Sequence, residues 1–181
     1  RINKRNNPTN DGTIAPDNTG AAITSQQQYI TNPITATTGS ATVLTTADVG
    51  STTVVPFVIP AGSQIRDFSL YQTAAAGGLV GGVITVAIAQ TSPSTGTVTT
   101  TTIGTITPTA AGGKIAGVFT ASAAVATLIN NIGTLDATLT FSAASVTTLT
   151  SGSLAGTLDV GYTPRNVDGS ITPYGSGYSN S

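Results

Sequence analysis

The amino-acid sequence predicts an all-β fold, an antiparallel β-sandwich or jelly roll, and three observations support this. The chain is rich in Thr and Val, whose β-branched side chains favour strands. It has no Glu and only 7% charged residues, whereas helices in water depend on Glu, Lys and Arg. Short runs of alternating apolar and polar residues are separated by Gly, Pro, Ser and Thr, as in sandwiches and barrels.

The length of 181 residues fits one domain with extensions at both ends. Residues 1–28 have hardly any apolar periodicity and predict an extended N-terminal arm. Residues 29–163 carry the strand patterns and predict the β-sandwich domain. Residues 164–181 form a polar, Gly-rich C-terminal tail in which Tyr174 and Tyr178 are the large side chains.

About eight strands are expected within the domain. In Arg66 to Gln72, Phe68 and Leu70 share one face, which indicates a half-buried strand. Pro56 interrupts the run from Thr52 to Ile59, so that segment is expected to be an edge strand or to contain a bulge. The other expected β-segments are Val83–Gln90, a hairpin around Val98–Ile106, Leu135–Phe141 and Leu154–Tyr162.

One segment has helical spacing instead. Apolar residues fall at i, i+3, i+4 and i+7 from Val125 to Ile132. We therefore predict a short helix near 122–131, which begins at Thr120 or Ser122 and ends at Asn131 to Gly133.

Composition excludes most catalytic chemistry, and we predict that the protein is not an enzyme and binds no cofactor or metal. The chain has neither His nor Cys, which removes disulfides, thiolate metal sites and the usual nucleophile–base constellations. Asp136 and Asp159 are a conceivable carboxylate pair for glycoside cleavage, but each alternates with apolar residues, and we expect both to keep a sheet face hydrated. A faint calcium-loop pattern before Asn18 is explained by turn chemistry.

The charge balance also bears on partners. A net charge of −1 gives little repulsion between copies and favours association. Nucleic acid and anionic membranes require a basic surface, so we expect neither as a partner. The one basic cluster, Arg1, Lys4 and Arg5, is either a solvated terminus or a small arm that contacts an acidic neighbour.

The uncharged stretch from Ala74 to Ala89 superficially resembles a membrane span, with glycines at the spacing of packed membrane helices. It is shorter than the roughly 20 residues needed, and its second half is β-branched. We expect a glycine turn followed by a strand.

Arg66 and Asp67 are adjacent charges at the start of a predicted strand. Because neighbours in a strand point to opposite faces, we do not expect them to pair with each other. Water or a contact across a subunit boundary is the expected partner of each, and charge at a strand start also guards against incorrect edge pairing.

The segment FVIPAGSQIRDFSLYQTAAAGG, residues 57–78, resembles one found in small structural proteins of tailed bacteriophages. There, a strand ends in Pro-Ala-Gly, turns, and starts a second strand with an acid and alternating apolar residues before a Gly-rich turn. The matching residues here are Pro60, Ala61, Gly62, Ile65, Asp67, Phe68, Leu70, Thr73, Ala74, Gly77 and Gly78, followed by a strand at Val83–Ala89. The resemblance covers about a fifth of the chain.

That resemblance implies a virion protein, and more specifically a capsid decoration or cement protein that binds the outside of a phage head, often as a trimer. The implied partners are the major capsid protein or other virion proteins, and the implied location is the capsid surface. Alternatives are a phage tail, neck or fibre component, or a secreted glycan-binding or surface-layer β module. The candidate assembly contacts are Arg1, Lys4, Arg5, Arg66, Asp67, Tyr174 and Tyr178.

Overall fold

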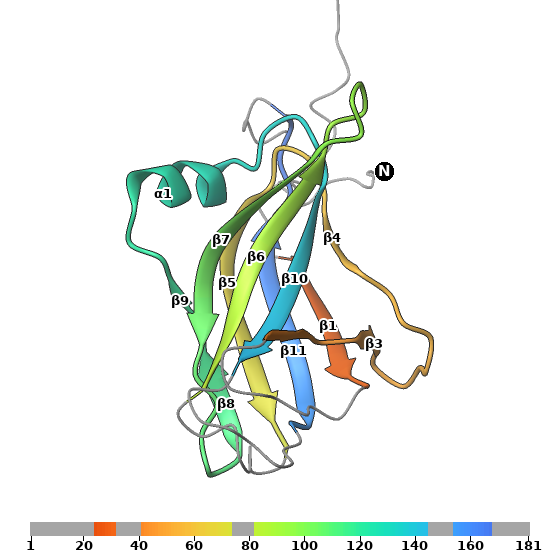
Figure 1. The fold of residues 1–181 in the computed structure, drawn as a ribbon, viewed down its shortest axis with the longest axis vertical. Helices are drawn as coiled ribbons and strands as arrows, with labels where there is room; N and C mark the ends of the chain where they lie inside the picture. The colour runs from red at the N-terminus through yellow and green to blue at the C-terminus, as the bar shows by residue number, and fades with distance from the viewer. Residues whose placement is uncertain (1–23, 32–40, 74–81, 145–153, 168–181) are drawn as a thin grey trace, which may run out of the picture.

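The computed structural model describes residues 24–31, 41–73, 82–144 and 154–167. These residues form eleven strands, arranged in two antiparallel sheets, and one short helix (Figure 1). The first sheet contains, in spatial order, β3 (Thr46–Asp48), β1 (Thr24–Ile30), β11 (Gly156–Thr163), β5 (Gln64–Gln72) and β8 (Gly113–Ala116). The second contains β2 (Ala41–Val43), β10 (Ala137–Ala144), β6 (Val83–Thr91), β7 (Val98–Ile106) and β9 (Val118–Phe119), with β4 (Phe57–Ile59) also paired to β10. The all-β sandwich expected from the sequence is confirmed.

The core lies between the two sheets and is built from alternate residues of the long strands. In β10, Ala137, Leu139, Phe141 and Ala143 are all buried, while the residues between them are partly exposed. The core side chains of β6 and β11 follow the same two-residue period, which is the geometry of a pleated strand, whereas bulges interrupt it in β5 and β7. The largest fully buried ones are Phe57, Phe68, Phe141, Ile59, Leu70, Ile84, Ile88, Ile103, Ile106 and Leu158.

All four phenylalanines of the chain pair within this core. The ring centroids of Phe57 and Phe141 lie 5.2 Å apart at a tilt of 58°. Those of Phe68 and Phe119 lie 4.9 Å apart in an edge-to-face arrangement. Both geometries are favourable for aromatic pairs, so each pair adds specific packing to the apolar burial.

Two chain crossings close the sides of the sandwich. On one side, the chain passes from β8 in the first sheet to β9 in the second through Gly117. A Cβ atom at Gly117 would overlap the ring of Phe68, so the crossing requires glycine. On the other side, the chain leaves β2, adds β3 to the first sheet and returns to the second sheet as β4 (Figure 1).

The helix α1 (Ala123–Asn130) confirms the predicted helical segment. Ser122 is the N-cap, and its hydroxyl accepts a hydrogen bond from the Val125 amide at 3.1 Å. Asn131 is the C-cap, and Gly133 has a positive φ of 85°. Val125 is buried, so one face of the helix packs against the core.

The first sheet begins inside the range that the sequence predicts as the N-terminal arm. Residues 24–28 belong to β1, which pairs with β11 on one side and β3 on the other. Polar residues fill this strand because Gln26 and Gln28 replace apolar core contacts with hydrogen bonds. Gln26 donates to the Val58 carbonyl, and Gln28 donates to the Pro56 carbonyl. A count of apolar residues therefore sets the end of the arm about five residues too late.

Most strand predictions agree with the structure. Arg66–Gln72, Val83–Gln90, Leu135–Phe141 and Leu154–Tyr162 correspond to β5, β6, β10 and β11. The hairpin expected around Val98–Ile106 is wrong, since this segment is the single strand β7 and its hairpin partner is β6. In the run from Thr52 to Ile59, Pro56 precedes the short edge strand β4, as expected.

The structure describes only the second part of the stretch from Ala74 to Ala89 that was considered as a membrane span. Residues 74–81 lie outside the described residues, and Val83 to Ala89 form most of β6. Within the ranges that the structure describes, no helix is long and apolar enough to cross a membrane.

Candidate assembly surface

Two of the seven predicted assembly contacts fall within the described residues. Arg66 and Asp67 lie near the start of β5. The other five, Arg1, Lys4, Arg5, Tyr174 and Tyr178, lie outside the described residues.

A β-bulge sets the directions of Arg66 and Asp67. Asp67 is opposite Gly161 of β11 and Ile65 is opposite Tyr162, so Arg66 has no partner in the ladder. The extra residue breaks the strict alternation that the sequence predicts, and both charged residues are exposed. The Arg66 guanidinium lies 3.4 Å from the Thr163 hydroxyl, to which it donates.

The outer face of the first sheet gathers further charges near Asp67. Asp67, Ser69 and Tyr71 share this face of β5, while Asp159 stands opposite Ser69 and Lys114 stands opposite Tyr71. The Lys114 ammonium lies 5.1 Å from the centre of the Tyr71 ring, within the range of a cation–π contact. A hydrogen bond with Tyr71 raises the pKa of Lys114, and the nearby Asp159 and Asp67 carboxylates act in the same direction more weakly.

Two polar atoms on this face lack hydrogen-bond partners. Ser69 is 3% exposed, and neither its hydroxyl nor Oδ1 of Asp159 makes a hydrogen bond within the described structure. They lie opposite each other on β5 and β11. In the described part of the chain, no group of three or more His, Cys, Asp or Glu side chains is placed to hold a metal ion.

The two carboxylates weighed as a hydrolytic pair have separate positions. Asp159 lies in the first sheet, whereas Asp136 immediately precedes β10 of the second sheet. Asp136 accepts a hydrogen bond from the Ala61 amide at 2.9 Å. This bond ties Asp136 to the turn that follows β4.

The Pro60–Ala61–Gly62 turn has the conformation that the sequence indicates. The Ser63 amide donates to the Pro60 carbonyl at 3.2 Å, and Gly62 has a φ of 78°. A positive φ at the third turn position is the requirement that glycine meets. The Asn166 backbone crosses directly over Gly62, so a Cβ atom there would overlap the Asn166 carbonyl.

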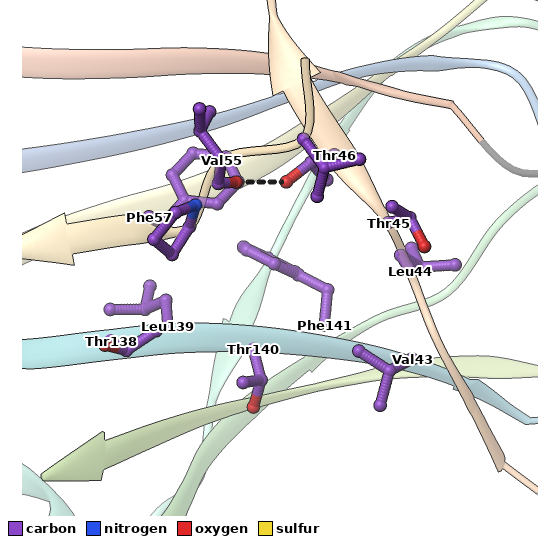
Figure 2. Close-up of a pocket in the computed structure, with 12 residues that line it drawn as sticks. Val43, Leu44, Thr45, Thr46, Val55, Phe57, Thr138, Leu139, Thr140 and Phe141 are labelled. Carbon is purple, nitrogen blue, oxygen red and sulfur yellow. Dashed lines mark hydrogen bonds between the residues drawn. The ribbon is translucent and has the colours of Figure 1, made fainter. Parts of the chain in front are cut away.

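A surface pocket that the sequence does not reveal lies where the chain crosses between β2, β3 and β4. We call it the seam groove; it is lined by residues 43–46, 54–57 and 138–141 and has a volume of about 310 Å³ (Figure 2). Figure 2 shows Phe141 between the leg that carries Val55 and Phe57 and the leg that carries Leu44 to Thr46. The Thr46 hydroxyl donates to the Val55 carbonyl at 3.2 Å. The groove has no charged lining residue.

Exposed valines surround the seam groove. Val43 and Val54, at 60% and 57% exposure, belong to its lining, and Val49 and Val58 lie on the same crossing. Half of the large apolar residues that are exposed in the described structure therefore come from one short segment. Only Pro56 hints at this surface in the sequence, because it marks an interrupted strand.

In comparisons with known proteins, no family model, no curated protein and no solved structure matches the chain. The fold and surface define an all-β sandwich with few charges and an apolar groove at one seam.

Proposed function

We propose that this protein is a structural component of a bacteriophage virion, most specifically a decoration or cement protein that binds the outside of the head. The observation that carries the proposal is the low charge. Charged residues make up 7% of the chain, against about 25% in an ordinary soluble domain. A surface of this kind repels other copies weakly and is suited to being covered by neighbouring molecules.

The proposed mechanism is adhesive. Apolar side chains and backbone hydrogen bonds, spread over a large permanent interface, would hold capsomers together. Exposed valines around the seam groove supply apolar area for such contacts. The bulged Arg66 and Asp67 supply exposed charge at a separate position on the first sheet.

The resemblance of residues 57–78 to phage structural proteins supports the same class. Its turn residues, Pro60 to Gly62, form the tight turn that the resemblance implies. The proposed partners are the major capsid protein or other virion proteins, with the chain itself forming a homotrimer on the capsid surface. Nucleic acid and membranes are not proposed partners.

The location on a particle tests this proposal. An antibody against the chain, applied to purified virions from its source, should label the whole head surface in electron micrographs. Label confined to the tail vertex would favour the tail, neck or fibre alternative. If particles carry no label and a glycan array binds the purified chain, the secreted-module alternative would replace the virion proposal.

A trimmed chain tests the role of the arm. Removal of residues 1–23 spares β1, whereas removal of 1–28 would also delete Gln26 and Gln28 and their hydrogen bonds to the β4 segment. We expect the shorter trimming to weaken attachment to particles while the circular dichroism spectrum stays that of a β-protein. Unchanged attachment would remove the arm from the proposed mechanism.

A further inference from the structure

We infer that the seam groove binds the N-terminal segment of a second copy of the chain, with the Ile14 side chain inserted between the β2 and β4 legs. This contact between copies does not depend on whether the particle is a phage head. In this contact the groove is the binding site, and an apolar side chain from the segment that precedes β1 is its ligand.

The chemistry of the groove selects an aliphatic side chain. Leu44, Phe57 and Phe141 are buried in its walls, and Val43 and Val54 stand exposed at its rim. A volume of about 310 Å³ accommodates one branched aliphatic side chain together with part of its backbone. Since no charged side chain lines the groove, a charged ligand would lose its hydration without a compensating partner.

The backbone at the groove favours an extended ligand. β2 and β4 pair with the same edge of β10, with Val43 opposite Ser142 and Phe57 opposite Leu139. The Leu44 amide also donates to the Phe141 carbonyl at 2.7 Å, so the two legs separate at Thr140. An extended segment laid across this gap would direct alternate side chains into the groove and away from it.

Within residues 1–23, Ile14 is the side chain best suited to this site. The segment has three large aliphatic residues, Ile2, Ile14 and Ile23. Ile2 is adjacent to Arg1 and close to a further charge at Lys4, and Ile23 directly precedes β1. Around Ile14 the nearest charges are three residues away on either side, about 10 Å along an extended chain, so they stay outside the groove.

The direction of β1 favours the segment of a second copy over that of the same copy. Gln26 bonds the Val58 carbonyl and Gln28 bonds the Pro56 carbonyl, so β1 runs along the crossing toward the groove. Thr24 is at the end of β1 farther from the groove, so a segment of the same copy could enter the groove only by reversing direction. Ile14 is ten residues before Thr24, a span of about 33 Å when extended, enough to reach an adjoining molecule.

Disulfide trapping tests the inference directly, because the chain contains no cysteine. The full-length double variant Ile14→Cys/Val54→Cys is oxidised and separated by non-reducing electrophoresis. The matched control is Ile14→Cys/Val98→Cys, since Val98 on β7 has the same 57% exposure as Val54. We expect at least tenfold more interchain disulfide in the Val54 variant than in the control.

Two results would overturn the inference. An intrachain product, seen as a monomer with a disulfide that persists on dilution, would mean that each copy fills its own groove. Equal interchain yield from both variants would mean that the segment does not recognise the groove. Mixing the single variant Ile14→Cys with isotope-labelled Val54→Cys checks the intermolecular assignment, since only contact between copies gives the mixed dimer.

Self-association of unlinked protein gives an independent measurement should the cysteine variants fail to fold. We expect Ile14→Asp to weaken association at least tenfold by analytical ultracentrifugation. Ile2→Asp, which introduces the same charge elsewhere in the segment, should change it less than threefold. If Ile14→Asp associates as strongly as the wild-type protein, the proposed insertion is refuted.

Discussion

At the scale of single residues, several charged side chains in the described part of the chain have an identifiable local environment. Asp136 holds the Ala61 amide of a turn, and Lys114 lies over the Tyr71 ring. Arg66 and Asp67 both face outward because a bulge adds one residue to β5. The sequence predicts exposed charge at these two positions, but it cannot predict the bulge, whose register depends on the partner strand β11.

Tyr71→Phe should lower the pKa of Lys114 toward its ordinary value of 10.5, because the variant keeps the ring but removes the hydroxyl. The raised pKa means that folding stabilises charged Lys114. This stabilisation is present below the unfolded-state pKa and lost as pH rises through the folded-state pKa. NMR titration of the lysine side chains measures the change, with Lys4, the only other lysine, as an internal reference. An unchanged Lys114 titration would contradict the assigned hydrogen bond.

Gly62→Ala should destabilise the fold much more than Gly50→Ala. Both glycines have positive φ, 78° and 87°, and a left-handed conformation costs alanine about 1 kcal/mol. A new Cβ at position 50 meets nothing within 4 Å, whereas at position 62 it overlaps the Asn166 backbone. We expect a loss of roughly 3 kcal/mol or more at Gly62, since overpacking adds about 1–3 kcal/mol. Urea unfolding curves with equal losses for the two variants would show that the crossing over Gly62 is absent.

At the scale of elements, the long strands and the short ones differ in how well the sequence predicts them. β6, β10 and β11 bury every second side chain for most of their length, so apolar alternation identifies them. β2, β3 and β4 have three residues each, too few for a period to appear. β1 is polar; it pairs with β11 and β3 in the first sheet, and its Gln26 and Gln28 side chains form hydrogen bonds to the β4 segment.

Gln28→Ala should show the strength of those bonds. Gln28 is 3% exposed, donates to the Pro56 carbonyl and accepts from the Thr46 hydroxyl at 2.6 Å. Its removal leaves the Pro56 carbonyl without this partner, whereas the Thr46 hydroxyl can still donate to the Val55 carbonyl, so we expect a loss of about 1–2 kcal/mol in the free energy of unfolding. The adjacent Gln27→Ala, at an exposed position, should cost less than about 0.5 kcal/mol. A similar small loss for both variants would mean that the Gln28 hydrogen bonds do not stabilise the contact between β1 and the segment before β4.

At the scale of the whole molecule, association should depend on apolar contact and hardly on ionic contact. Salt screens exposed charges, with a Debye length of about 10 Å at 0.1 M. With a net charge of −1 and an uncharged seam groove, we expect sodium chloride between about 0.05 and 0.5 M to change the association constant less than threefold. Ammonium sulfate should strengthen association, because it favours apolar burial.

Sedimentation at several protein concentrations measures both salt effects. Dissociation by sodium chloride alone would show that charged residues, such as Arg66 and Asp67, hold the copies together. Monomers at every salt and protein concentration would instead remove self-association from the proposed function.

The sequence by itself determined the fold class, the positions of the long strands and the helix, and the scarcity of charge. These properties follow from side-chain period, capping residues and composition, which are local along the chain. Tertiary structure alone decided that β1 is a sheet strand, that Arg66 is bulged outward, and that an apolar groove forms beside β10. Each of these depends on which distant segment lies opposite, and this pairing cannot be predicted from the spacing of residues along the chain.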